Sequence, residues 1–558
     1  MQTNDIALLI VFLLALGLSA PALGAWMAKV FSGEPHLLSR MLGRVERLIL
    51  RSAGVDPGRG MGWKTYLSAI LVFNLAGFVV LMALQLLQHR LPANPQGLPA
   101  VPPWLAFNTA VSFVTNTNWQ AYSGEATLSN LTQMLGLGVQ NFLSAATGIA
   151  VFLALVRGLR GRPGDHLGNA WVDLVRATLH VLLPLSIVLA VALVSQGVVQ
   201  SFADFPEAST LEGAKQVVPL GPAASQIAIK QLGTNGGGFF GVNSAHPFEN
   251  PTPLSNFLEL LAILLLPAAL PFTFGRMTGR PRDGRVLFGV MAALFLGATA
   301  LSITAEHGLG AAGLEGKELR FGPAATALWG AATTAASNGS VNGMHDSMAP
   351  LSGAAQLFQM MTGEVIFGGV GSGMYGMLLY ALLAVFLAGL MVGRTPEYLG
   401  KRIDAPMLAW AVAGLLLPSA AILAGTALSC ALPAGAGAVS NAGPHGFSQI
   451  LYAWTSAGAN NGSAFGGLGA GADFYCIGLG VAMLVGRYGV IVPVLLLAGR
   501  ALRCRSVPPS GGTFPTGGLL FGVLLLSVIV IVGGLTFLPA LFLGPVAEHL
   551  LLSAGRLF

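Results

Sequence analysis

Four short clusters of asparagine, threonine, serine and glycine interrupt an otherwise apolar chain. The triads at their centres are Asn116-Thr117-Asn118, Thr234-Asn235-Gly236, Ser337-Asn338-Gly339 and Asn460-Asn461-Gly462. None of them contains a carboxylate, which a calcium or magnesium site would normally include. Glycine allows positive φ values that turn successive carbonyl groups toward one side, and rings of carbonyl oxygens can replace the water shell of a monovalent cation. The triads therefore predict a site for a dehydrated monovalent cation.

The triads recur at similar intervals. Their third residues are separated by 118, 103 and 123 positions, and a proline stands 14 to 18 residues before each of them. These prolines are Pro103, Pro222, Pro323 and Pro444. About ten helical residues after a first-turn proline would rise ~15 Å, which is half the hydrocarbon thickness of a bilayer. The C-terminal ends of four such half-helices would direct partial negative charge at one axis and favour a cation there.

Each cluster alone would fit an ordinary extracellular loop rich in turn-forming residues. Four clusters at similar spacing favour instead a repeat of span, half-helix, polar loop and span. We expect a flanking helix with a cytoplasmic loop at 1–60 and a C-terminal flanking helix at 506–558. The four pore-loop repeats between them are expected at 61–170, 171–282, 283–404 (with a broken second helix) and 405–505.

The composition predicts a membrane protein. Charged residues make up 9% of the 558 residues and hydrophobic residues 54%, whereas a soluble domain carries about 25% charged residues. Apolar runs long enough to span a bilayer lie near 6–28, 66–88, 130–156, 177–199, 256–275, 286–305, 351–393, 407–430, 474–499 and 518–543. We therefore expect an all-α polytopic membrane protein of about ten transmembrane helices, with four re-entrant pore-loop repeats around a pseudo-fourfold axis. No soluble segment is large enough for a nucleic-acid site.

Lysine and arginine are distributed unevenly between the connections. Of the 28 basic residues, 21 lie in five connections, and these alternate with connections that hold only six. The rich connections are 29–64, 157–176, 276–285, 394–402 and 500–505. By the positive-inside rule they are cytoplasmic, which places both termini on the outer side.

The run 351–393 is too long for one straight span and contains GEVIFGGVGSGMYG at 363–376, which predicts a helix broken at membrane depth. The letters GSGMYG formally match a dinucleotide-binding GxGxxG motif, but the strand and the acidic residue that this motif requires are missing. We favour an intramembrane gate loop made flexible by Gly369, Gly371 and Gly373. Close helix packing through small residues is the alternative.

Two ionisable residues fall at membrane depth, where charge is costly and often functional. Glu364 opens the gate loop, and Arg487 interrupts the apolar run 474–499. We expect Glu364 to pair with a cation or line an aqueous cavity, and Arg487 to lie beside the filter exit or a tunnel. A structural ion pair, or a side chain that snorkels to the interface, is the alternative.

Five ionisable residues flank the polar clusters in sequence. They are Glu125, Lys230, His246, Glu249 and Asp346. We expect them to line an outer vestibule or brace the loops rather than bind the ion.

The chain lacks the parts needed to hydrolyse ATP. It has no GxxxxGK[ST] sequence, no Asp-Lys-Thr-Gly phosphorylation stretch and no soluble loop that could house a nucleotide domain. It is therefore not expected to be an enzyme by itself or to carry a covalent cofactor. Active pumping would have to be powered by a partner.

Several long strings resemble one known family. They are FNTAVSFVTNTNWQAYSGE at 107–125, QIAIKQLGTNGGGFFGVNSAHPFENPTP at 226–253, MVGRTPEYLGKRID at 391–404 and GPVAEHL at 544–550. They resemble the potassium-transporting A subunits (KdpA) of the bacterial Kdp ATPase, within the superfamily of potassium transporters, and the resemblance covers nearly the whole chain. Asn118 stands where the other three triads have glycine, so the fourfold symmetry is imperfect.

The resemblance implies that the four triads form a selectivity filter for K⁺ and that Gln120 helps to shape the ion site. It also implies a tunnel leading sideways from the filter, while the 363–376 loop closes the direct path inward. The partners would be the P-type ATPase subunit KdpB and the small membrane subunits KdpC and KdpF, in the inner membrane of a bacterium. The subunit would select and dehydrate extracellular K⁺ and pass it toward the ATPase subunit for import.

Two other functions remain open from the sequence. The chain could be an autonomous potassium channel or symporter of the same superfamily. It could also be a membrane receptor or scaffold whose loops bind a partner rather than an ion.

Overall fold

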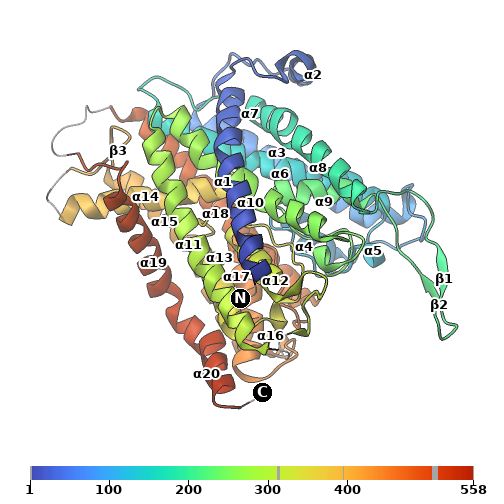
Figure 1. Cartoon of the computed structure of the whole chain (residues 1–558). Coiled ribbons are helices and arrows are strands. Elements are labelled where there is room, and N and C mark those ends of the chain that lie inside the picture. Colours follow the sequence, from blue (N-terminus) through green and yellow to red (C-terminus); the bar gives the residue numbers. More distant parts are fainter. Residues whose placement is uncertain (1–2, 311–313, 392, 394, 506–512, 557–558) are drawn as a thin grey trace.

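The computed structural model describes residues 3–310, 314–391, 393, 395–505 and 513–556, and these residues form a predominantly helical protein (Figure 1). Val392 and Arg394 of the 391–404 string, the first residues of the 506–558 segment and the extreme termini lie outside the described residues. The strands in the described part are two short hairpins, β1 (Glu207–Ser209) with β2 (Lys215–Val217), and β3 (Glu397–Tyr398) with β4 (Lys401–Arg402). The predicted all-α class is confirmed.

Ten helices in the described residues are long and apolar enough to cross a membrane, and they coincide with the ten predicted spans. The first five are α1 (Thr3–Ser32), α3 (Trp63–Leu87), α6 (Val139–Arg160, preceded by a π-helical turn), α7 with α8 (Ala170–Arg176, Leu183–Ser195) and α10 (Pro253–Met277). The others are α11 (Pro281–Gly308), α14 (Ser372–Met391), α15 (Ala405–Ala431), α18 (Asp473–Arg503) and α19 with α20 (Leu519–Leu541, Ala547–Ser553). Short elements off the spans are α2 (Ser39–Ser52), α5 (Gly124–Thr127) and α16 (Pro433–Ala436).

The break predicted in the run 351–393 is present. Helix α13 (Pro350–Met361) has 12 residues, which rise only ~18 Å and cannot span a bilayer. Residues 362–371 leave the helix before α14 begins. We call this segment the 362–371 loop.

A short helix lies at each predicted half-helix position. These are α4 (Pro103–Val114), α9 (Ala223–Leu232), α12 (Gly322–Ala335) and α17 (Gly443–Ala459). In each one the proline stands at the N-cap or in the first turn, where its missing N–H costs no helical hydrogen bond. The polar triads begin within three residues of the helix ends.

The spans that follow the short helices form the inside of the bundle. Between 56% and 83% of the apolar windows of α6, α10, α14 and α18 are buried, against 17% to 39% in the preceding spans α3, α8, α11 and α15. Outer helices that keep apolar faces exposed fit contact with lipid, because lipid tails are as apolar as leucine. The inner helices are therefore the ones that position the polar clusters.

The arginine-rich connections gather at one end of the bundle, the upper end in Figure 1. Three hydrogen bonds join neighbouring connections there. The Met61 N–H donates to the Gly168 carbonyl (2.7 Å), and the Thr516 hydroxyl donates to Asp283 (3.0 Å). The Lys401 ammonium donates to the Cys504 carbonyl (2.7 Å). The beginning of α1 and the end of α20 lie toward the opposite end. This arrangement fits the predicted alternation of the connections, and the identity of the cytoplasmic side stays a prediction.

At that opposite end, His445 fastens α17 to α20. Its Nδ1 lies 2.8 Å from Glu548 Oε1 and its Nε2 lies 2.9 Å from Asp346 Oδ1. Hydrogen bonds to Asp346 and Glu548 raise the pKa of His445 to about 10. The imidazolium therefore bridges two carboxylates at neutral pH.

We predict that His445→Gln lowers stability at neutral pH but not at high pH. The pKa is raised in the folded state, so the stabilisation is complete below the unfolded value near 6.5 and is lost as pH rises through about 10. Hydrogen bonds to charged groups contribute about 1.5–3 kcal/mol, so the thermal midpoint of wild type should exceed that of the variant by about 1–3 °C at pH 7. A difference that does not shrink toward pH 10.5 would contradict the bridge.

Candidate functional site

The four triads, far apart in sequence, meet in one closed set of contacts that we call the polar ring. Each loop is bonded to the next, and the fourth is bonded back to the first. The bonds are Asn116 Nδ2 to the Thr234 carbonyl (2.9 Å), Asn338 Nδ2 to the Lys230 carbonyl (3.0 Å), Asn461 Nδ2 to the Thr333 carbonyl (2.9 Å) and Asn460 Nδ2 to Thr117 Oγ1 (3.0 Å). The structure thus brings together every triad that the sequence singled out.

The four loops leave their helices in the same way. In every loop, the N–H of the middle triad residue donates to the carbonyl five positions earlier in the chain. These bonds run from Thr117 to Ser112 (2.8 Å), Asn235 to Lys230 (2.8 Å), Asn338 to Thr333 (3.1 Å) and Asn461 to Ser456 (2.8 Å). Such a bond satisfies one orphan carbonyl of a helix end, and its fourfold recurrence is backbone evidence for a repeat.

Backbone handedness alternates along each triad. The first and third residues all have positive φ: 65° and 52° in the first loop, 48° and 77° in the second, 55° and 85° in the third, 61° and 94° in the fourth. The middle residues are not among the positive-φ residues. Alternation of this kind is the conformation that can turn successive carbonyls toward one side. The sequence did not reveal that non-glycine first residues share the conformation, which costs ~1–2 kcal/mol for each.

Glycine at the third position is required by close approach. A Cβ on Gly236, Gly339 or Gly462 would lie 1.6 to 2.3 Å from a carbonyl oxygen of the neighbouring loop. The first loop differs, because Asn118 turns its Nδ2 to Asn141 Oδ1 (2.8 Å) and to the Gly236 carbonyl (3.2 Å). Its departure from glycine is therefore accommodated by a side chain that bonds to the next loop.

Gln120 ties the first two loops together beyond the triads. Its Nε2 donates to the Gly238 carbonyl (2.9 Å) and its Oε1 accepts from the Gly238 N–H (2.8 Å). It also lines a cavity of about 430 Å³ between these loops and the loop of residues 341–344. Gln120 therefore lies beside the polar ring, and its role in shaping an ion site stays a prediction.

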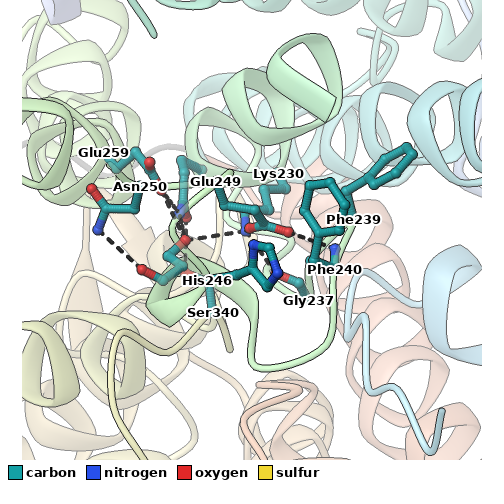
Figure 2. Close-up of polar contacts among 12 residues, drawn as sticks. Lys230, Gly237, Phe239, Phe240, His246, Glu249, Asn250, Glu259 and Ser340 are labelled. Carbon is teal, nitrogen blue, oxygen red and sulfur yellow. Dashed lines mark hydrogen bonds and ion pairs between the residues drawn. The ribbon is translucent and has the colours of Figure 1, made fainter. Parts of the chain in front are cut away.

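A buried network braces the second loop from behind (Figure 2). The fully buried Lys230 ammonium donates to the Gly237 carbonyl (2.9 Å) and to Ser244 Oγ (3.1 Å), and it pairs with the fully buried Glu249. Glu249 Oε1 in turn accepts the Phe240 N–H (2.8 Å). The ammonium thus fixes the carbonyl directly after the second triad.

The other flanking residues also contact loop backbone or one another. Glu125 accepts the Gly241 N–H (2.7 Å), Asp346 bonds to His445, and His246 stacks on Phe240 with ring centroids 4.5 Å apart. Burial lowers the pKa of His246. These contacts fit the predicted bracing role.

The 362–371 loop packs against the polar ring. Val370 N–H donates to Thr234 Oγ1 (2.8 Å), and Asn461 Nδ2 donates to Glu364 Oε1 (2.7 Å). A Cβ on Gly369 would lie 3.2 Å from Ser337 Cβ. Three of the four triad loops therefore touch this segment directly.

Two of the predicted gate glycines are places where no side chain fits. A Cβ on Gly371 would lie 2.1 Å from the Gly148 carbonyl oxygen of α6, and one on Gly373 would lie 2.1 Å from the Phe367 carbonyl oxygen. The structure thus shows the close packing that was the alternative to flexibility.

Arg487 neither snorkels to an interface nor forms an ion pair with a described residue. Its side chain is 3% exposed, and its Nη2 donates to the Ser144 carbonyl of α6 (2.9 Å). Among the described residues its Nε has no hydrogen-bond partner. Arg487, Glu364, Ser337 and Asn460 line a cavity of about 60 Å³ beside the polar ring, which is large enough for water molecules.

Sequence reasoning missed the polar residues of α6 that support the ring. Ser144 Oγ donates to Asn116 Oδ1 (2.8 Å), and Asn235 Nδ2 donates to the same oxygen (2.6 Å). The signal was present, because Asn141 and Ser144 are polar residues inside an apolar span, and polar side chains there face the bundle interior.

The Lys230–Glu249 pair generates a stability prediction. Removing one partner of a buried pair leaves an uncompensated charge and costs about 3–5 kcal/mol, so Lys230→Met should lower the thermal midpoint sharply. Lys230→Met combined with Glu249→Gln should recover part of the loss. The matched control is Lys215→Met, whose partner Glu207 is exposed, and exposed pairs contribute about 0–1 kcal/mol. Equal effects of Lys230→Met and Lys215→Met on thermal unfolding would contradict the brace.

Comparison with known proteins places this geometry in a family. The family model described as "Potassium-transporting ATPase A subunit" matches residues 10–550. The chain is 59% identical to a protein of Sorangium cellulosum, over 96% of this chain and 97% of that protein, and 58% identical to one of Pseudomonas syringae pv. tomato, over 99% and 100%. A protein of Pseudomonas aeruginosa is 55% identical over 99% and 100%. All three are named "Potassium-transporting ATPase potassium-binding subunit". The chain belongs to the KdpA family, the A subunits of potassium-transporting ATPases.

Proposed function

We propose that this chain is the potassium-binding and translocating subunit of an ATP-driven potassium import complex. The observation that carries the proposal is the closed polar ring of four loops with alternating backbone handedness and no carboxylate in its triads. Such a ring offers neutral oxygens at fixed spacing, which is the chemistry that replaces the water shell of K⁺. The names of the relatives agree with potassium as the ion.

The ion would enter through the cavity beside Gln120 and lose its water in the polar ring. The C-terminal ends of α4, α9, α12 and α17 add partial negative charge there. Network bonds such as Lys230 to Gly237 hold the carbonyls in place. A rigid ring resists contraction around a smaller ion such as Na⁺, which favours K⁺.

Beyond the ring, the 362–371 loop would block the straight path inward. The small cavity at Glu364 and Arg487 would receive an ion that leaves the ring on this side, and it would lead sideways toward a partner. Cation passage beside Arg487 is opposed by its charge, as in other pores guarded by arginine. This obstruction supports a subunit of a pump over an autonomous channel or symporter.

In this proposal ATP hydrolysis takes place in a partner, the P-type ATPase subunit KdpB, with the small subunits KdpC and KdpF completing the complex. The complex would lie in the bacterial inner membrane, with both termini of this chain on the outer side. The division into four repeats at 61–170, 171–282, 283–404 and 405–505, with flanking segments, belongs to the same proposal. Each proposed repeat contains one of the half-helices α4, α9, α12 and α17 and one of the inner spans α6, α10, α14 and α18.

We predict that Gly236→Asp reduces the preference for K⁺ over Na⁺ by roughly tenfold or more. The preference is measured as cation-dependent ATPase activity of the assembled complex. The new carboxylate would meet the Asn338 carbonyl and change both field and size of the ring. Gly213→Asp is the matched control, because Gly213 also has positive φ (80°) but nothing within 4 Å of a Cβ.

If Gly236→Asp fails to assemble, Gln120→Leu tests the same site, since it removes both bonds to Gly238 and should also weaken K⁺ preference. An assembled complex in which either variant keeps full K⁺ preference would show that the ion binds elsewhere.

We predict that Arg487→Met, a change of similar length, raises passive K⁺ flux through reconstituted complexes roughly tenfold, because a charge in a low-dielectric site repels cations strongly. K⁺ affinity of the ATPase activity should change less than the flux. Arg503→Met at the end of α18 serves as the control for loss of positive charge. Unchanged flux and unchanged pumping would assign Arg487 a purely structural role.

A further inference from the structure

Helix α2 (Ser39–Ser52) lies outside the bundle, at the end where the arginine-rich connections gather (Figure 1). It carries two different stripes along its length. Its four arginines recur at i, i+4, i+7 and i+11 and form one stripe: Arg40, Arg44, Arg47 and Arg51. Its apolar residues form the other: Met41, Val45, Leu48 and Ile49.

A third face fixes the rotation of α2 on the protein. Glu46 Oε1 accepts Arg176 Nε (2.9 Å), Glu46 Oε2 lies 2.9 Å from His180 Nε2, and Leu50 is 2% exposed. The hydrogen bonds of His180 and Arg176 lower the pKa of Glu46 to about 2, so this attachment persists at physiological pH. The helix cannot turn its apolar stripe toward the protein without breaking these contacts.

The apolar stripe is therefore left without cover. Met41 is 65% exposed, Leu48 69% and Val45 41%, and Leu37 just before the helix is 91% exposed. Large exposed apolar side chains gathered on one face mark a membrane or protein contact.

The arginine stripe is also left without partners. None of the four guanidinium groups forms an ion pair with a described residue, whereas Arg157, Arg176, Arg320 and Arg500 all do. Arg47 lines a cavity of about 400 Å³ with His36 and Ser39, between α2 and the end of α1. The stripe thus offers four unneutralised positive charges beside the apolar one.

We propose that α2 lies in the headgroup region of the leaflet on this side of the protein and binds anionic phospholipids. The apolar stripe would insert between acyl chains, while the arginines would contact the phosphates. A helix with an apolar face and a basic face takes this position on anionic membranes. Charge complementarity and the exposed apolar stripe favour lipid over a second protein as the occupant.

The test uses the full chain, alone and with its co-purifying subunits, with Cys430, Cys476 and Cys504 replaced by serine. Leu48→Cys carries a fluorophore, and the protein is placed in nanodiscs of phosphatidylcholine with or without phosphatidylglycerol. Quenching by lipids spin-labelled near the headgroup reports insertion. We expect at least about a tenfold preference for discs that contain phosphatidylglycerol, reduced by high salt.

Changing the four arginines of α2 to glutamine should abolish the preference, and changing them to lysine should retain it. The control removes four exposed arginines from other connections on the same side: Arg160, Arg162, Arg282 and Arg285. Three results would overturn the proposal: quenching that is equal in both kinds of disc, a control as damaging as the α2 variant, or a label shielded by another subunit in the complex.

Discussion

A chain that leaves its helix inside an apolar bundle must satisfy its freed N–H and carbonyl groups with protein groups, water or a bound ion, because no lipid can do so. The structure meets this constraint at five places, the four triads and the 362–371 loop. At each triad the helix end recaptures the N–H of the middle residue, and asparagine amides bond to the next loop. Asparagine suits this work because its amide donates without bringing a charge. The loops consequently hold one another in place.

This mutual support also explains why small differences between the loops matter. Three loops approach so closely that only glycine fits, while at the first loop Asn118 bonds to the Gly236 carbonyl. A carbonyl that accepts an amide hydrogen bond has less negative charge available for an ion. The first two loops are further fixed by Gln120 and by the Lys230 network. In the proposed function, the ion would therefore meet four similar but unequal sides.

The parts that could be predicted from sequence depend on local length and pattern. An apolar run of about 20 residues spans a bilayer wherever it occurs, so the ten spans and the four short helices were predictable. The break at 362–371 followed from excess length and glycine. Contacts through space were not predictable in this way: nothing in the sequence pairs Asn461 with Glu364, or Arg487 with the Ser144 carbonyl. Positive φ at Thr234 was also hidden, since a β-branched residue normally avoids it.

Arg487 and Glu364 face one small cavity, and their placement bears on how an ion could leave the ring. Both are 3% exposed and neither is in an ion pair with a described residue. A buried guanidinium held by one carbonyl is costly, and the Glu364 side chain lines the same cavity. In the proposed function, K⁺ arriving there would meet the Glu364 oxygens and be repelled by Arg487, so its stay would be short. In that proposal, an ion driven out of such a site needs an acceptor nearby, and a partner subunit beside the cavity would supply it.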